Sequence, residues 1–136
     1  MGVERKGLTL KEYQERAMTT CLPACDNFSY MMLNLVGEVG EFASKVAKQI
    51  RKENLWIGGD FQYDNNHLRE PSASKMSFGE YEEVYADLKS EAGDILWQLA
   101  GLCEVMGWDL NDVAQCNLDK LADRKKEGTI ISHTDH

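Results

Sequence analysis

The chain has 136 residues, of which 43% are apolar, and its formal net charge is −8. This length fits one domain over residues 1–136 with a core of its own, and the acidic charge argues against a protein that holds nucleic acid through phosphate contacts. No apolar run approaches the roughly 20 residues of a membrane-spanning helix, and the first residues lack the apolar core of a signal peptide, so we expect a cytoplasmic protein that does not bind membranes.

Apolar residues recur with helical spacing along most of the chain, and no segment alternates as a strand would. The expected fold class is therefore all-α, with four helices. The first helix should open with a capping box, Thr9-x-x-Glu12, and be stopped by Pro23. The second should run from Asn27, as its N-cap, to about Asn54.

The third and fourth helices carry equally clear end signals. Ser77-x-x-Glu80 is a second capping box, and Gly107 marks the end of the helix that it opens. Asp109 should cap the fourth helix, which Gly128 ends.

A polar, glycine-containing segment from Leu55 to Met76 joins the second and third helices. It is longer than most connections in compact domains, and its aromatic residues, Trp56, Phe61 and Tyr63, favour an ordered element over a disordered one. The tail at 131–136 has no pattern and should fray.

Two acidic pairs stand out, Glu38-x-x-Glu41 in the second helix and Glu91-x-x-Asp94 in the third. Residues three apart are neighbours on a helix surface, so each pair brings like charges together at a cost in stability unless a cation shares them. At about 100° per residue, both pairs flank the apolar stripe of their helix on the same rotational side. If the two helices pack antiparallel through these stripes, all four carboxylates can converge.

Four carboxylates on rigid helices suit a hard divalent cation, Mg²⁺ or Mn²⁺. A solvated surface would explain one acidic pair in a chain with 23 acidic residues, but it explains two matched pairs beside the core less well. Gly37, Gly40 and Gly93 stand next to these carboxylates. Because each glycine costs roughly 1 kcal/mol of helix propensity, we expect them to let backbones approach closely.

Cationic and amide side chains follow on two of the helices. Lys45 and Lys48 lie beyond Glu41, and Asn117, Lys120 and Arg124 occupy successive turns of the fourth helix. An amide, an ammonium and a guanidinium along one side of a helix can bind a polyphosphate chain. The alternative is a solvated cationic helix end that complements the helix dipole.

The two acidic pairs, combined with the Asn-x-x-Lys-Leu-x-x-Arg run, resemble the MazG-like nucleoside triphosphate pyrophosphohydrolases of the all-α NTP pyrophosphatase superfamily. The resemblance covers about residues 9–54 and 78–130. It implies a four-helix bundle with a central antiparallel helix hairpin, assembled as a homodimer or a dimer of dimers. It also implies that the carboxylates bind Mg²⁺ and that the fourth helix contacts phosphate. The matching residues are Glu38, Glu41, Glu91, Asp94, Asn117, Lys120 and Arg124.

The leading hypothesis is a Mg²⁺-dependent enzyme that converts a (d)NTP to (d)NMP and pyrophosphate, with Glu38 or Glu41 activating the attacking water. The lysines at 45 and 48 would help to bind the substrate. The 55–76 insert is longer than in compact family members, so it should govern substrate choice rather than catalysis. Candidate base contacts are Tyr13, Gln14, Trp56 and Trp97.

Other readings stay open. A phosphoribosyl-ATP pyrophosphohydrolase shares the superfamily and its motifs. A non-catalytic helical interaction module would explain the apolar stripes but not the matched acidic pairs, and a di-iron carboxylate bundle would need Glu-x-x-His motifs. Apolar residues such as Leu33, Val36 and Tyr85 have no obvious partner within one subunit, which favours an oligomer.

Overall fold

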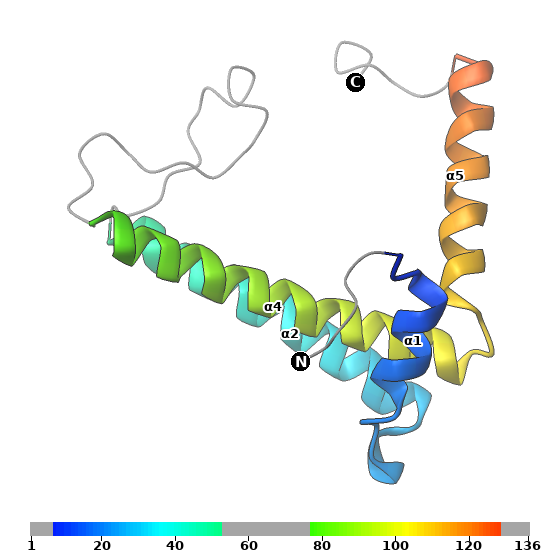
Figure 1. The fold of residues 1–136 in the computed structure, drawn as a ribbon, viewed down its shortest axis with the longest axis horizontal. Coiled ribbons are helices and arrows are strands. Elements are labelled where there is room, and N and C mark those ends of the chain that lie inside the picture. Colours follow the sequence, from blue (N-terminus) through cyan, green and yellow to red (C-terminus); the bar gives the residue numbers. More distant parts are fainter. Residues whose placement is uncertain (1–6, 53–76, 129–136) are drawn as a thin grey trace. The chain divides into compact units, whose positions relative to one another are not determined.

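The computed structural model describes residues 7–52 and 77–128, and these residues form four α-helices and one 3₁₀ turn (Figure 1). The all-α prediction is therefore confirmed. The predicted insert at 55–76, which includes Trp56, and the predicted frayed tail at 131–136 lie outside the described residues. Within the described ranges, no helix is long and apolar enough to cross a membrane.

The first helix, α1 (Leu10–Met18), begins at the predicted capping box. The Thr9 N–H donates to Glu12 Oε1 and the Glu12 N–H donates to Thr9 Oγ1, both at 3.0 Å. The helix ends five residues before Pro23, earlier than the sequence indicated. The cause is local, because the hydroxyls of Thr19 and Thr20 donate to carbonyls of the last turn at 2.6 and 2.7 Å. Such bonds satisfy acceptors that a further helical turn would otherwise bind.

Two long helices follow the 3₁₀ turn Pro23–Cys25. Asn27 caps α2 (Phe28–Arg51), as predicted, by accepting a hydrogen bond from the Tyr30 N–H at 2.8 Å. Helix α4 (Phe78–Val105) opens with the second predicted capping box. There the Ser77 N–H donates to Glu80 Oε1 at 2.9 Å, and the Glu80 N–H donates to Ser77 Oγ at 3.1 Å.

Helix α4 ends at Val105. Gly107 follows in the turn, and its φ of 74° is the left-handed conformation that glycine adopts most easily. The turn continues into α5 (Leu110–Lys126), where Asp109 accepts a hydrogen bond from the Asn111 N–H at 2.8 Å. Gly128, also with φ 74°, follows the end of α5. These boundaries agree with the predicted caps.

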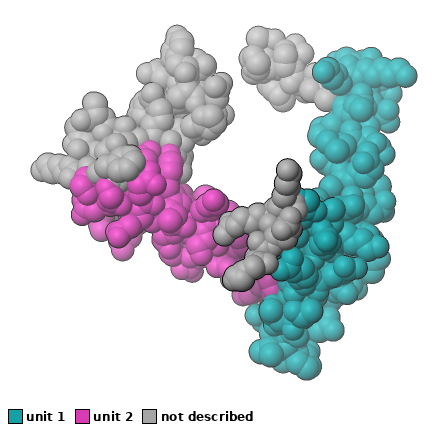
Figure 2. All heavy atoms as spheres, viewed as in Figure 1, with its two compact units in different colours: residues 1–31, 99–136 teal, residues 32–98 magenta. Residues whose placement is uncertain are grey.

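The chain divides into two compact units, residues 1–31 with 99–136 and residues 32–98 (Figure 2). The first, called unit 1 below, has a small core of Ala100, Cys103 and Leu110, against which Tyr13, Met18 and Val113 pack. Met31 is also fully buried there. A Cβ at Gly101 would lie 2.5 Å from the Sδ and Cε atoms of Met31, so glycine makes room for this side chain.

Gln14 links three parts of unit 1 and is only 5% exposed. Its Nε2 donates to Glu104 Oε1 at 3.1 Å and to the Trp108 carbonyl at 3.0 Å. Its Oε1 accepts from the Leu110 N–H at 2.7 Å. One side chain of α1 thus holds the end of α4, the following turn and the start of α5.

The second unit, unit 2, contains most of α2 and α4. The two helices are antiparallel, as predicted, since Glu38 faces Asp94 whereas Lys45, farther along α2, bonds to Asp87, earlier on α4. Leu88 is 5% exposed at their interface. Several apolar residues of unit 2 remain on its surface, with Leu33 at 75% and Val36 at 65% exposure.

The glycines beside the acidic pairs do not serve the close backbone approach that we expected. A Cβ added at Gly40 or Gly93 would meet no atom within 4 Å, and one at Gly37 would meet only Asn34 Oδ1, at 3.9 Å. Within the described residues of one chain, that expectation is wrong, because Gly40 and Gly93 face open space and Gly37 meets only a side chain of its own helix.

Candidate functional site

The pairing of α2 with α4 brings three of the four predicted carboxylates together. One oxygen each from Glu38, Glu91 and Asp94 lies within 4.8 Å of the other two. Glu38 and Glu91 are half-buried and Asp94 is exposed. Their meeting follows from the spacing that the sequence shows, because residues three apart on one helix face a residue on the antiparallel neighbour. The group, called the acidic cluster below, does not include Glu41, which is exposed.

The donor set fits a hard divalent ion. Mg²⁺ takes oxygen ligands at about 2.1 Å in an octahedron, so neighbouring ligand atoms lie about 3 Å apart and opposite ones about 4.2 Å apart. One oxygen from each residue of the acidic cluster lies within 4.8 Å of the others, so small side-chain rotations would bring the three oxygens to this spacing. Three carboxylates also leave coordination positions for water and for substrate phosphates, as is common for Mg²⁺ sites. The cluster can therefore hold one divalent ion.

The electrostatics of the acidic cluster point the same way. Burial raises the pKa of Glu38 above its ordinary value, and the negative charges of Asp94, Glu91 and Glu41 raise it further. The charged form of Glu38 is therefore disfavoured by its own neighbours. A cation within the cluster would remove this repulsion.

Lys45 contacts the acidic cluster directly. Its Nζ donates to Glu91 Oε2 at 2.6 Å and to Asp87 Oδ1 at 3.0 Å. Hydrogen bonds to Glu91 and Asp87 raise the pKa of Lys45 well above its ordinary range. Lys48, one turn further along α2, is exposed. Both lysines border a small hollow of about 110 Å³, which is lined by Lys45, Lys48, Gln49, Val84, Asp87 and Leu88.

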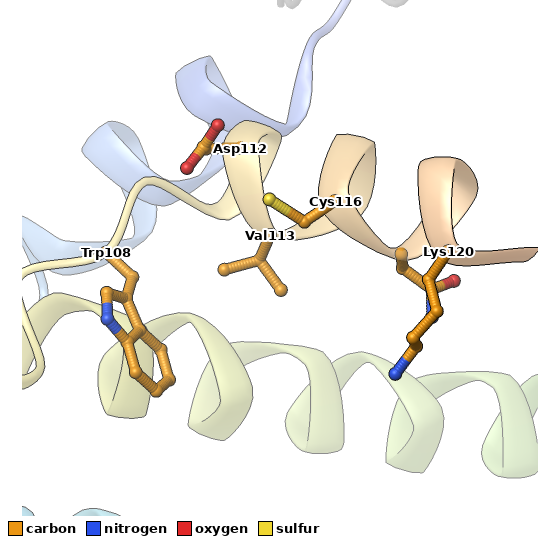
Figure 3. A pocket seen from close by; sticks show the side chains of 6 residues that line it. Trp108, Asp112, Val113, Cys116 and Lys120 are labelled. Carbon is orange, nitrogen blue, oxygen red and sulfur yellow. The ribbon is translucent and has the colours of Figure 1, made fainter. Parts of the chain in front are cut away.

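A second hollow lies in unit 1 at the start of α5 (Figure 3). It has a volume of about 420 Å³ and is lined by Trp108, Asp112, Val113, Cys116, Asn117 and Lys120. We call it the α5 hollow. Figure 3 shows Val113 between the indole of Trp108 and the ammonium of Lys120. The structure thus brings Asn117 and Lys120 together, whereas Arg124, one turn beyond, is exposed and is not part of the lining.

Comparison with known proteins identifies the family. A MazG nucleotide pyrophosphohydrolase domain matches residues 27–129. The chain belongs to the MazG family. It is also similar to the Gene 37 protein of Mycobacterium phage L5, with 32% identity over 115 residues that cover 82% of this chain and 81% of the phage protein. No solved structure gives a significant match. The resemblance inferred from the motifs is confirmed, and both acidic pairs and the polar run of α5 lie within the matched MazG range.

Three of the residues predicted to contact the base lie within the described part of the MazG chain, and their burial differs. Gln14 is buried and hydrogen-bonded within unit 1, which gives it a structural role there. Tyr13 packs, half-buried, against the core of the same unit. Trp97 is half-buried on α4 in unit 2. None of these described positions is an open aromatic surface.

Two residues that border these sites escaped the sequence analysis of the MazG chain. Asp87 shares Lys45 with Glu91. It precedes Glu91 by four residues, so the helical spacing that picked out the acidic pairs could have found it. Trp108 is 50% exposed and lines the α5 hollow. It stands in a short turn without helical periodicity, so the only feature in the sequence that could have singled it out is its large apolar ring.

Proposed function

We propose that the protein is a divalent-metal-dependent nucleotide pyrophosphohydrolase that converts a (d)NTP and water into a (d)NMP and pyrophosphate. The observation that supports this most directly is the acidic cluster, three carboxylate oxygens within 4.8 Å inside a MazG domain. A helical interaction module would gain nothing from such a cluster, because like charges at this distance cost stability. A metal-dependent enzyme uses the same charges to hold its ion.

The residues divide the chemistry among them. Glu38, Glu91 and Asp94 would hold Mg²⁺, or Mn²⁺ in its place, which when bound neutralises phosphate charge and polarises the phosphoryl group under attack. Glu41 or Glu38 accepts the proton of the attacking water at a carboxylate oxygen. The water oxygen bonds to the α-phosphorus, the bond from that phosphorus to the bridging oxygen breaks, and pyrophosphate leaves with the electron pair.

The substrate is bound by side chains of two helices in this proposal. Lys48 of α2 and Asn117, Lys120 and Arg124 of α5 contact the phosphates through charge-assisted hydrogen bonds. Trp108 offers the base an exposed aromatic surface beside Asn117 and Lys120. The assembly in this proposal is a homodimer or a dimer of dimers.

The reaction is tested with a panel of (d)NTPs and phosphoribosyl-ATP in ¹⁸O-labelled water with Mg²⁺. We expect pyrophosphate rather than orthophosphate as the released product, with the label in the nucleoside monophosphate, because water attacks the α-phosphorus. Label in the released pyrophosphate would mean attack at the β-phosphorus. A preference for phosphoribosyl-ATP would favour the second enzyme of the superfamily.

Variants test the residues. Glu41→Ala and Asp94→Ala should each lower kcat by about 10²-fold or more, since both a general base and an ion ligand contribute on this scale. The control is Glu82→Ala, an exposed carboxylate nine residues before Glu91 and thus about 180° away around α4. Full activity of either test variant with its helical circular dichroism intact would refute the assignment.

A further inference from the structure

Lys45 occupies a position between a carboxylate of the acidic cluster and one outside it. Its Nζ lies 2.6 Å from Glu91 Oε2 and 3.0 Å from Asp87 Oδ1. The Glu91 side chain is only 12% exposed, whereas that of Asp87 is 54% exposed. Among the described ion pairs, this is the one that reaches the acidic cluster. The ammonium of Lys45 thus forms ion pairs with one largely buried carboxylate, Glu91, and one solvated carboxylate, Asp87.

The position of Lys45 has a direct electrostatic reason. Three carboxylates carry a charge of −3, and a half-buried carboxylate without a partner is costly. The ammonium of Lys45 offsets part of this charge when no ion is bound. A divalent ion held by Glu91 would need the same carboxylate that Lys45 now binds, and two cations at one carboxylate repel each other.

Asp87 gives Lys45 a place to remain. It precedes Glu91 by one helical turn and already accepts a hydrogen bond from the same Nζ. Lys45 can therefore release Glu91 and keep Asp87 through a rotation of its own flexible side chain. No helix has to move.

We propose that Lys45 is the internal counter-cation of the metal-free acidic cluster and that a divalent ion binds in competition with it, while Asp87 retains the displaced ammonium. The inference rests on the proposed function, since it takes Glu91 as an ion ligand. The alternative is that Lys45 is a positioning residue, which holds the Glu91 side chain in the orientation that the ion needs. The two roles predict opposite effects, because loss of a competitor tightens ion binding whereas loss of a positioning residue weakens it.

The experiment is a calorimetric titration of the full chain with Mn²⁺ alone, without nucleotide, at physiological salt. Lys45→Met should lower the Kd for Mn²⁺ by about threefold or more, on the scale of measured ion-pair energies. Lys48→Met removes the same charge from the next turn of α2 and borders the same hollow, but it should change the Kd little. Lys45→Gln repeats the test should the methionine variant fold poorly.

A double-mutant cycle tests whether Asp87 acts through the ammonium of Lys45 or only through its own negative charge. Asp87→Asn should weaken Mn²⁺ binding in the wild-type background and have little effect in the Lys45→Met background, because Asp87 acts by retaining Lys45. Three results would each overturn the inference while leaving the proposed function intact. They are unchanged or weaker Mn²⁺ binding in Lys45→Met, equally tightened binding in Lys48→Met, and the same effect of Asp87→Asn in both backgrounds. If no variant and no wild-type protein bound Mn²⁺, the proposed function would fail together with it.

Discussion

At the scale of single residues, Glu38 carries the clearest electrostatic signature of the site. Its pKa is raised first by burial and then by three neighbouring carboxylates. A group with a raised pKa in the folded state holds its proton more tightly there than in the unfolded chain. The free energy of unfolding therefore falls as pH rises from the ordinary value near 4.5 through the raised pKa.

The direction of this pKa shift predicts how neutralising Glu38 changes stability. In EDTA at pH 7, Glu38→Gln should increase the free energy of unfolding by about 0.5 kcal/mol, the usual scale of like-charge repulsion on helices, and the gain should vanish below the ordinary pKa. Urea denaturation at a series of pH values measures both. With saturating Mn²⁺ the order should reverse, because the variant has lost an ion ligand. A gain that persists at low pH, or that also occurs in Glu82→Gln, would contradict this account.

The sequence could predict that Glu38, Glu91 and Asp94 meet, but it placed Glu41 with them, which the structure leaves outside the acidic cluster. It could not predict how each side chain is paired. Helical spacing fixed the angular positions of Glu38, Glu91 and Asp94, and antiparallel packing did the rest. The partner of Lys45 depends on the conformation of a long flexible side chain, which leaves no pattern in the sequence. For the same reason the contact between Lys45 and Asp87 could not be predicted. The role of Lys45 in substrate binding stays a prediction.

At the scale of helices, local signals were sufficient for most boundaries. The caps at Thr9, Asn27, Ser77 and Asp109 depend on residues within a few positions of each other. Gln14 is different, because its three hydrogen-bond partners lie 90 to 96 residues away. Nothing in the local sequence distinguishes it from a surface glutamine, so its structural contacts could not be predicted.

The second prediction concerns this glutamine. Gln14→Leu should lower the free energy of unfolding by about 1–3 kcal/mol, because it leaves the buried Leu110 N–H without its acceptor and removes the donor to the part-buried Trp108 carbonyl. Urea denaturation measures the loss. Gln115→Leu, on the exposed surface of α5, should stay within about 0.5 kcal/mol of wild type. Equal stabilities of the two variants would show that Gln14 does not hold α5 in place.

At the scale of the whole molecule, the exposed apolar residues of α2 favour an interface with another subunit. Leu33 and Val36 are 75% and 65% exposed, and Val39 is 48% exposed. Soluble monomers seldom expose apolar residues so close together on one helix, and such patches usually mark an interface. Homo-oligomerisation, which the sequence also favoured, remains a prediction.

Sedimentation velocity provides the test. The wild-type protein should sediment as a stable oligomer at micromolar concentration, and Leu33→Asp should dissociate it by placing a charge in the apolar contact. Leu22→Asp is the matched control, because Leu22 is 66% exposed but lies outside the long helices. A monomeric wild type would contradict the prediction, and an intact oligomer in the Leu33 variant would exclude this part of α2 from the interface.

The glycines of the long helices have a consequence for engineering. Gly93→Ala and Gly101→Ala give the same gain in helix propensity, up to about 1 kcal/mol. The alanine methyl enters open space at Gly93, but at Gly101 it meets the fully buried Met31, and overpacking costs about 1–3 kcal/mol. Thermal melting in EDTA should therefore rank Gly93→Ala above wild type and Gly101→Ala below Gly93→Ala. Equal melting temperatures would mean that Met31 repacks freely. If the ranking holds, thermostable variants of this protein can be sought at the glycines that border its acidic residues and not at Gly101, which makes room for Met31 in the core.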